Sequence, residues 1–387
     1  MLCVKNGMIH DALHKEAFRG DILVKDGKIA AIGENLEIPE SAEIVDAEGL
    51  QVYPGFVEAH GHIGLDGYGI GYEGMDYNEM NDIISPQMRG IDGVKPMDPA
   101  FAMARAAGVT CVCVGPGSAN VLGGTFTTVK TVGRRVDDMV VRDGVAMKCA
   151  FGENPKRVYK DKKDSSRMTT AALLRDALFK AREYMEKKEA AGDDMSKRPA
   201  FDMKHEALIP VLKREIPLKA HAHAAEDIFT ALRIAKEFDL KITLEHVTEG
   251  HLIAEELAKE GFPAIVGPDL ASRSKIEVQN MAFKTVGVLN KAGLMTAVTT
   301  DHPVSLIQSL PLCAGLAVKA GLDMEEGYKA ITIHPAVICG VGHRVGSLEA
   351  GKDADIAVFD GNPMEVFTNT LYTIIDGQVV YDRAAQT

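Results

Sequence analysis

The chain has 387 residues, of which 46% are hydrophobic and 25% charged, and its formal net charge is −12. This length exceeds that of one small domain and suits a large barrel with a smaller appended unit. The acidic balance argues against nucleic acid or an anionic membrane as the main partner, because both need clustered Lys and Arg.

The two ends of the chain share a β-rich texture. Apolar runs at 21–25 and 28–32 flank Asp26-Gly27, and an Asp-Gly pair between apolar runs is a strong hairpin signal. Near the C-terminus, runs at 371–375 and 378–381 flank Asp376-Gly377 in the same way. We therefore expect residues 1–54 and 345–387 to build one small β-sandwich domain.

Between these ends, short apolar runs alternate with longer helical patterns. Strands alternating with helices imply βα units and a parallel sheet. Residues 55–344 are therefore expected to form an α/β fold, a (β/α)8 TIM barrel of eight βα units. The predicted strands include 109–114, 240–245, 264–267 and 295–300, and the predicted helices include 169–191, 225–238, 252–261 and 303–321.

The N-terminus lacks the basic and apolar regions of a signal peptide, and no apolar run approaches the roughly 20 residues that span a bilayer. The six cysteines lie mostly in apolar runs and form no CxxC pair, as is typical of buried free thiols in a reducing compartment. We therefore expect a cytoplasmic protein that acts on a small molecule, with neither nucleic acid nor membrane as partner. A homo-oligomer is the assembly to test.

Histidines and an aspartate end four of the predicted strands. Two of these strands carry an HxH pattern, and alternate residues of a strand face the same way, so that each pair can reach one metal. The carboxyl ends of the strands of a βα barrel converge at one mouth, where we expect all four ends to meet. Imidazole and carboxylate donors suit zinc and related divalent metals. In chain order the residues are His60, His62, His221, His223, His246 and Asp301.

Residues 145–153 add a fifth candidate segment. They place Lys148 inside an apolar strand and Glu153 just after it. A lysine in such a place more often extends its charged end to water or caps a terminus. Taken alone, this segment does not decide between a structural and a metal-binding role.

Two longer motifs resemble the amidohydrolase superfamily. Residues 53–62, YPGFVEAHGH, are similar to its opening strand, usually PGxIDxHxH, and residues 345–356, VGSLEAGKDADI, are similar to its C-terminal return, usually GxxxxGxxADxV. The runs KAHAH at 219–223 and TDHP at 300–303 resemble imidazolonepropionase-like and Xaa-Pro-dipeptidase-like members. The resemblance implies a metal-dependent hydrolase over nearly the whole chain.

The resemblance also implies one or two divalent cations per chain, zinc first, with manganese or iron as alternatives. His60 and His62 would bind the more buried cation. His221 and His246 would bind the second, or His221 alone would complete a site with a single cation. Whether His221 or His223 is the ligand stays open.

Further roles follow from the same resemblance. Lys148 would bridge two cations after carboxylation, unless Glu153 is the ligand from that strand instead. Asp301 would bind metal and accept the proton of the attacking water. His223 and His302 would stabilise the developing oxyanion.

Predicted loops near the strand ends carry Arg157, Arg167 and Arg273. The planar guanidinium fits a carboxylate, so one of them would bind a substrate carboxylate, as expected for a dipeptide or an N-acyl amino acid. Glu226 follows His223 closely and would also face the substrate, together with His302.

The leading hypothesis is hydrolysis of an amide, cyclic amide or peptide C–N bond in a small molecule by metal-activated water. The alternative is deamination of a ring C–N bond, which a single cation and a neutral ring pocket would favour. A catalytically silent barrel that binds a ligand would predict a broken set of metal ligands. The complete set of histidines and the aspartate speaks against it.

Overall fold

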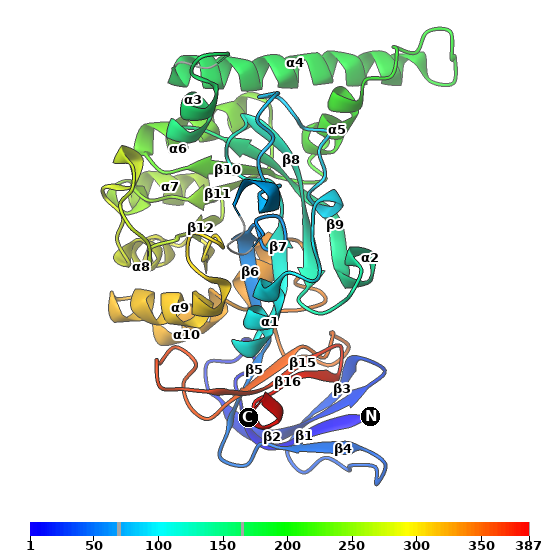
Figure 1. Cartoon of the computed structure of the whole chain (residues 1–387), viewed down its shortest axis with the longest axis vertical. Helices are drawn as coiled ribbons and strands as arrows, with labels where there is room; N and C mark the ends of the chain where they lie inside the picture. Colours follow the sequence, from blue (N-terminus) through cyan, green and yellow to red (C-terminus); the bar gives the residue numbers. More distant parts are fainter. Residues whose placement is uncertain (68–70, 164–165, 387) are drawn as a thin grey trace.

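The computed structural model describes residues 1–67, 71–163 and 166–386, and its strands form two sheets (Figure 1). Strands from both ends of the chain make the lower sheet of Figure 1, which we call the terminal sheet. Strands from the middle of the chain make a barrel above it.

The terminal sheet has the order β16-β15-β14-β5-β1-β2-β3, with β4 paired to β1. Both predicted hairpins are present, and φ is positive at both residues of Asp26-Gly27 and of Asp376-Gly377, as a type I′ turn requires. The prediction that both chain ends build one β unit is confirmed, while its limits at 54 and 345 stay predictions. The strands are β1 (Leu2–Ile9), β2 (Phe18–Lys25), β3 (Lys28–Gly33), β4 (Glu43–Asp46), β5 (Gln51–Pro54), β14 (Ile356–Phe359), β15 (Thr370–Ile375) and β16 (Gln378–Asp382).

The barrel sheet runs in chain order from β6 to β13. Its two ends meet where His62 N donates to His302 O at 2.8 Å and Thr299 Oγ1 donates to His60 O at 2.7 Å. The predicted barrel is confirmed, and its carboxyl-terminal mouth brings the ends of β6, β10, β11 and β13 together. The strands are β6 (Phe56–Gly61), β7 (Val109–Val114), β8 (Leu122–Lys130), β9 (Val140–Ala150), β10 (Leu218–Ala222), β11 (Ile242–His246), β12 (Ala264–Val266) and β13 (Thr296–Val298).

One barrel strand departs from the expected eight βα units. β8 is antiparallel to both of its neighbours, β7 and β9, whereas the other neighbouring strands pair in parallel. The connections at 115–121 and 131–139 are shorter than the dozen or so residues that a parallel crossover needs. The chain therefore turns back on itself here.

The helices that follow β9 in the chain cover the outside of the barrel (Figure 1). The predicted helices at 169–191, 225–238 and 252–261 are present as α4, α6 and η3 with α7. The prediction at 303–321 is wrong at its start, because a turn after Asp301, closed by Ser305 N donating to Thr300 O, precedes the helix. The α-helices are α1 (Pro99–Ala106), α2 (Val136–Met139), α3 (Glu153–Tyr159), α4 (Arg167–Ala191), α5 (Met203–Leu212), α6 (Ala225–Glu237), α7 (Ala254–Glu260), α8 (Lys284–Lys291), α9 (Leu310–Lys319), α10 (Met324–Lys329) and α11 (Ile333–Ile338). The 3-10 helices are η1 (Tyr72–Gly74), η2 (Gly90–Asp92), η3 (Gly250–Leu252), η4 (Ile276–Val278), η5 (Ile307–Ser309) and η6 (Ala384–Gln386).

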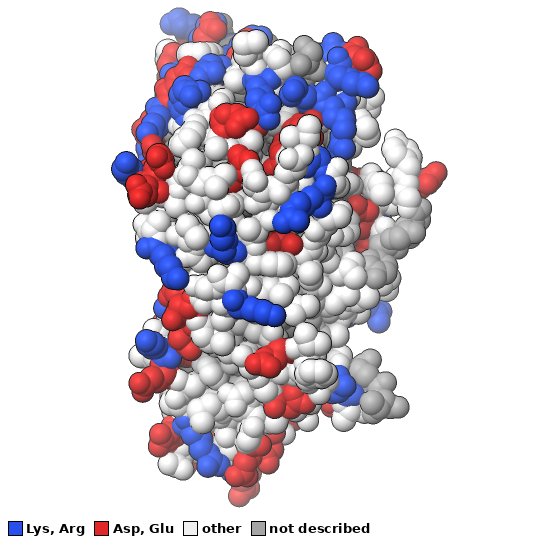
Figure 2. All heavy atoms as spheres, turned by 90° about the vertical axis from the view of Figure 1, so that its left-hand side faces the viewer, with Lys and Arg blue, Asp and Glu red and all other residues white. Residues whose placement is uncertain are grey.

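All six cysteines are buried and unpaired, as the sequence predicts. On the part of the chain that the structure describes, no helix is long and apolar enough to cross a membrane. Figure 2 shows basic side chains mixed with acidic ones at the upper end of one face, with a less charged stretch below them. The charge on this face is therefore of both signs.

Candidate metal centre

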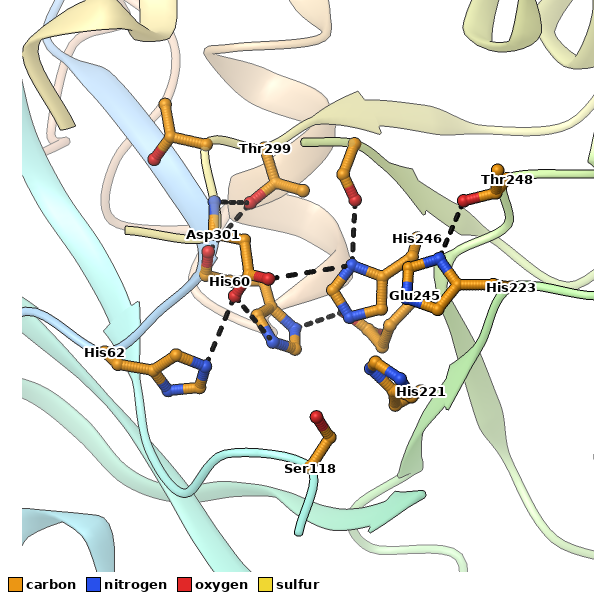
Figure 3. Close-up of polar contacts among 12 residues, drawn as sticks. His60, His62, Ser118, His221, His223, Glu245, His246, Thr248, Thr299 and Asp301 are labelled. Carbon is orange, nitrogen blue, oxygen red and sulfur yellow. Dashed lines mark hydrogen bonds and ion pairs between the residues drawn. The ribbon is translucent and has the colours of Figure 1, made fainter. Parts of the chain in front are cut away.

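Two groups of donor side chains meet at the mouth of the barrel (Figure 3). The first cluster is His60, His62 and Asp301. The second cluster is His221, His223 and His246. Within each cluster the donor atoms lie within 4.8 Å of one another. The ring centroids of His60 and His246 are 5.1 Å apart, so the two clusters are neighbours.

The first cluster directs two imidazole nitrogens at one carboxylate. Asp301 Oδ1 lies 3.2 Å from His62 Nε2 and 3.6 Å from His60 Nε2. On the opposite edge of each ring, His60 Nδ1 donates to Glu245 Oε2 and His62 Nδ1 donates to Gly115 O, both at 2.7 Å. Bonds at Nδ1 fix the orientation of a metal-binding imidazole and leave Nε2 as the ligand atom.

The second cluster is held in a similar way, with one exception. His246 Nδ1 donates to Gly267 O at 2.8 Å, and His223 Nδ1 lies 2.7 Å from Thr248 Oγ1. His221 Nδ1 is buried and has no hydrogen-bond partner among the described residues. An unpaired buried nitrogen is costly, so its place beside two other imidazoles fits a ligand atom.

Burial favours the neutral form of four of the imidazoles, those of His60, His221, His223 and His246. It lowers the pKa of His246 to about 4 and holds the pKa values of His60, His221 and His223 well below the usual histidine value. Only the neutral ring has a free nitrogen lone pair to give to a metal. The donor set therefore suits a divalent cation in both clusters.

Lys148 is fully buried in β9 and faces the first cluster. Its Nζ lies 3.1 Å from His60 Nε2, and burial lowers the pKa of Lys148 to about 8. Burial also raises the pKa of Asp301, but the neighbouring His62, His246 and Lys148 lower it by more, so that it lies below the usual value. The Asp301 carboxylate is therefore ionised beside a buried amine.

Two of these residues sit on strained backbone at strand ends. Asp301 has a φ of 49° and His246 a φ of 72°, and such left-handed conformations cost about 1–3 kcal/mol each in residues other than glycine. Glu58 braces the first of these turns, because its Oε2 accepts from Thr300 N at 2.8 Å and from Thr300 Oγ1 at 2.7 Å. The strain fits a turn that aims its side chain at the site.

Glu245 supports the first cluster, and the sequence reasoning gave it no role. Its Oε2 accepts from His60 Nδ1 and, at 2.9 Å, from Lys219 Nζ, while its Oε1 accepts from Thr243 Oγ1 at 2.5 Å. Glu245 directly precedes His246 in LEH, and the positive φ of His246 lets both consecutive residues face the site. The strand alternation alone would have sent one of them away.

We expect Glu245→Gln to lower metal affinity by about 10- to 100-fold. The native carboxylate orients the His60 ring and raises its basicity, and the neutral amide would do both less well. Competition with a chelating dye measures this affinity. Glu255→Gln on the exposed face of α7 is the matched control and should change nothing. An unchanged affinity in a folded Glu245→Gln protein would contradict the role given to Glu245.

A cavity of about 280 Å³ opens above the two clusters. His62, His221, His223 and Asp301 line it from the barrel. Loops at the mouth contribute further lining residues, among them Tyr77, Ser118, Asn154, Arg157, Thr248 and Lys275. The cavity is therefore large enough for a small molecule and reaches the candidate metal ligands.

Of the predicted substrate-binding residues, Arg157 lines this cavity. Arg167 instead pairs with Asp227, with Nε 2.9 Å from Oδ1, and its Nη2 lies 3.7 Å from Glu226. Arg273 Nη2 donates to Met281 O at 3.0 Å. On the described residues, the structure does not bring Arg167, Glu226 or Arg273 into the cavity lining.

Two other predicted residues lie near the site without joining a cluster. Glu153 Oε1 accepts from the backbone N of Glu277 at 3.0 Å, and Glu277 Oε2 accepts from Glu153 N at 2.8 Å. His302 is buried, and its Nδ1 accepts from Ile307 N at 3.2 Å. Of Lys148 in β9 and Glu153 at the start of α3, the structure therefore brings Lys148 to the clusters and leaves Glu153 outside both.

A barrel that gathers histidines, an aspartate and a buried lysine at its carboxyl-terminal mouth defines a class of metal-dependent barrel enzymes. A family model described as "Amidohydrolase family" matches residues 51–380. The chain therefore belongs to the amidohydrolase family, whose enzymes are hydrolases that act on C–N bonds, and the predicted resemblance is confirmed.

Relatives and solved structures agree with this assignment. Amidohydrolase tasK of Hapsidospora irregularis is 31% identical over 94% of this chain, which spans only 40% of that protein's length. A dihydroorotase of Elusimicrobium minutum is 25% identical over 94% of this chain and 89% of its own. The solved structure of an amidohydrolase from Thermotoga maritima MSB8 is 41% identical, covers 99% of this chain and 100% of its own, and has a TM-score of 0.96.

Proposed function

We propose that the protein hydrolyses a C–N bond of a small amide, cyclic amide or dipeptide with water activated by divalent metal. The observation that carries this proposal is the pair of neighbouring donor clusters beneath one cavity, with the Asp301 carboxylate near histidines of both. Zinc is the first metal to test, because imidazole and carboxylate donors suit it, and manganese and iron are the alternatives.

In this proposal each cluster holds one cation. His60 and His62 bind the first with Asp301, and His221 and His246 bind the second. Lys148 would supply a further oxygen ligand once carbon dioxide carboxylates its Nζ with loss of a proton, and that atom already lies 3.1 Å from His60 Nε2. A divalent cation bound here lowers the pKa of water toward 7 and polarises a carbonyl oxygen.

The chain's own groups then move the proton and hold the substrate. Asp301 lines the cavity and its ionised carboxylate accepts the proton of the attacking water, then passes it to the leaving nitrogen. His223 also lines the cavity. If Thr248 donates to His223 Nδ1, the neutral ring carries its proton on Nε2, which can donate to the developing oxyanion.

A substrate panel with a metal switch tests the proposal. Amides, cyclic amides and dipeptides should be hydrolysed by the protein as purified. A chelator should abolish turnover, and zinc or manganese should restore it. Release of ammonia from an intact ring would identify a deaminase instead. Hydrolysis that resists complete metal removal would contradict the proposal.

The remaining expectations belong to the same proposal. They are a small-molecule substrate, a location in the cytoplasm and assembly as a homo-oligomer. Light scattering of the purified protein tests the last of these.

A further inference from the structure

A polar corner of the cavity is built around Asn154. Asn154 Oδ1 accepts from Lys275 Nζ at 3.1 Å and from Arg157 Nη2 at 3.5 Å. Asn154 Nδ2 donates to Ser118 Oγ at 2.8 Å and lies 3.4 Å from His221 Nε2. A single amide group therefore separates two cationic side chains from a histidine of the second cluster. We call Asn154, Arg157 and Lys275 the cationic corner.

The cationic corner is held by contacts that do not depend on a substrate. Glu277 Oε1 accepts from Lys275 Nζ at 2.6 Å, and the Glu277 side chain is 1% exposed. The reciprocal bonds between Glu277 and Glu153 join η4 to the start of α3, the helix that carries Asn154 and Arg157. The helices that follow β9 and β12, the strands on either side of β10 and β11, are thereby fixed to each other.

The charges of the corner are not balanced. Lys275 is neutralised by Glu277, whereas Arg157 makes no ion pair within the ranges that the structure describes. Arg157 is exposed at the cavity, so its guanidinium is accessible to a ligand. A guanidinium presents a planar pair of donors that matches the two oxygens of a carboxylate. An anionic group is therefore the ligand that best completes the corner.

We propose that the cationic corner binds a substrate carboxylate attached to the carbon next to the hydrolysed C–N bond. This inference rests on the proposed function and names its substrate class. The corner lies one amide group from His221, so a carboxylate bound there stands only a few bonds from the carbonyl under attack. N-acyl α-amino acids, dipeptides, and cyclic amides with a carboxylate beside the ring nitrogen meet this condition.

Matched substrate pairs test the corner in the metal-loaded protein. Each pair differs only in a carboxylate or a carboxamide next to the scissile nitrogen, and N-acetyl-6-aminohexanoate carries the carboxylate too far away. We expect kcat/KM to favour the adjacent carboxylate by about 10- to 100-fold, the range for hydrogen bonds to charged groups. The carboxamide and the distant carboxylate should both be poor substrates.

Variants of Arg157 identify the residue responsible. Arg157→Met should lower the carboxylate preference toward unity, mainly through KM, and Arg157→Lys should keep part of it because the charge stays while the fork is lost. Arg233→Met is the matched control, since Arg233 is exposed on α6 and bonds only Thr230 Oγ1 among the described side chains. The preference should survive in this control.

Equal kcat/KM for carboxylate and carboxamide, with metal-dependent hydrolysis intact, would overturn the corner and leave the proposed function standing. Absence of hydrolysis from every pair would count against the proposed function instead. Calorimetric titration of the same pairs then tests whether the cationic corner binds a carboxylate. Tighter binding of the carboxylate that Arg157→Met removes would support it, and equal or absent binding would overturn it.

Discussion

Asp301→Asn should lower kcat by roughly 10²- to 10⁴-fold, the usual contribution of a positioned proton acceptor. An amide oxygen can still face the metal, but it cannot take a proton from water. Asn also tolerates the left-handed backbone that Asp301 adopts, with a φ of 49°. The bond from Asp301 N to Thr299 Oγ1, at 3.0 Å, does not involve the side chain, so the turn should persist.

Steady-state kinetics on any substrate from the panel measures this loss, with metal content determined on the same sample. Asp176→Asn is the matched control, because Asp176 pairs with Lys180 on the exposed surface of α4. It should retain wild-type activity. Activity of Asp301→Asn within tenfold of the wild type would remove Asp301 from its proposed role.

Lys148→Met should lower activity by more than the 10- to 100-fold loss that is typical when a residue that only supports a metal ligand is replaced. Methionine fills similar space in β9 but offers no nitrogen for carboxylation, so the two cations lose their bridge. We expect metal content to fall from about two equivalents per chain to about one. Lys148→Arg, which keeps a positive charge but cannot form the same carbamate, should behave alike.

Short carboxylates provide a sharper test of the bridge. Formate or acetate should restore part of the activity and of the second metal equivalent to a Lys148→Ala protein, because either can enter the space that the truncated side chain leaves. The Asp301→Asn protein should not respond. Two tightly bound equivalents and full turnover in Lys148→Met would show that Lys148 is not a ligand.

Local patterns were enough to predict the scaffold and both donor clusters. The Asp-Gly hairpins follow from turn chemistry that involves only two residues. The HxH pairs end strands, and strand ends of a barrel meet at one mouth whatever the connecting loops do. These features depend on the residue types and on their spacing along the chain.

Other features depended on packing between distant segments. The reversal of β8 reflects short connections, and its apolar run looks the same in either direction. Glu245 and Lys219 form a buried pair beneath His60, although each alone resembles an ordinary charged residue. Lys275 comes from a loop whose course the sequence does not specify, and no pattern linked it to Asn154.

The three arginines predicted to bind substrate also show that contacts between distant segments could not be predicted from the sequence. Arg157, Arg167 and Arg273 were equivalent as loop residues near strand ends. Only the fold distinguishes Arg157, which lines the cavity, from Arg167, whose guanidinium is occupied by Asp227. A prediction from charge and position could not separate them, because partners far apart in sequence decide which cation stays available.

The central claim is that two neighbouring clusters hold divalent metal, and metal content per chain tests it most directly. Mass spectrometry of the protein purified without chelator should find about two equivalents of zinc, manganese or iron. Both should be lost from a variant that replaces His60 and His246 together with alanine. A protein that carries no metal, even after reloading with each of these ions, would contradict the claim.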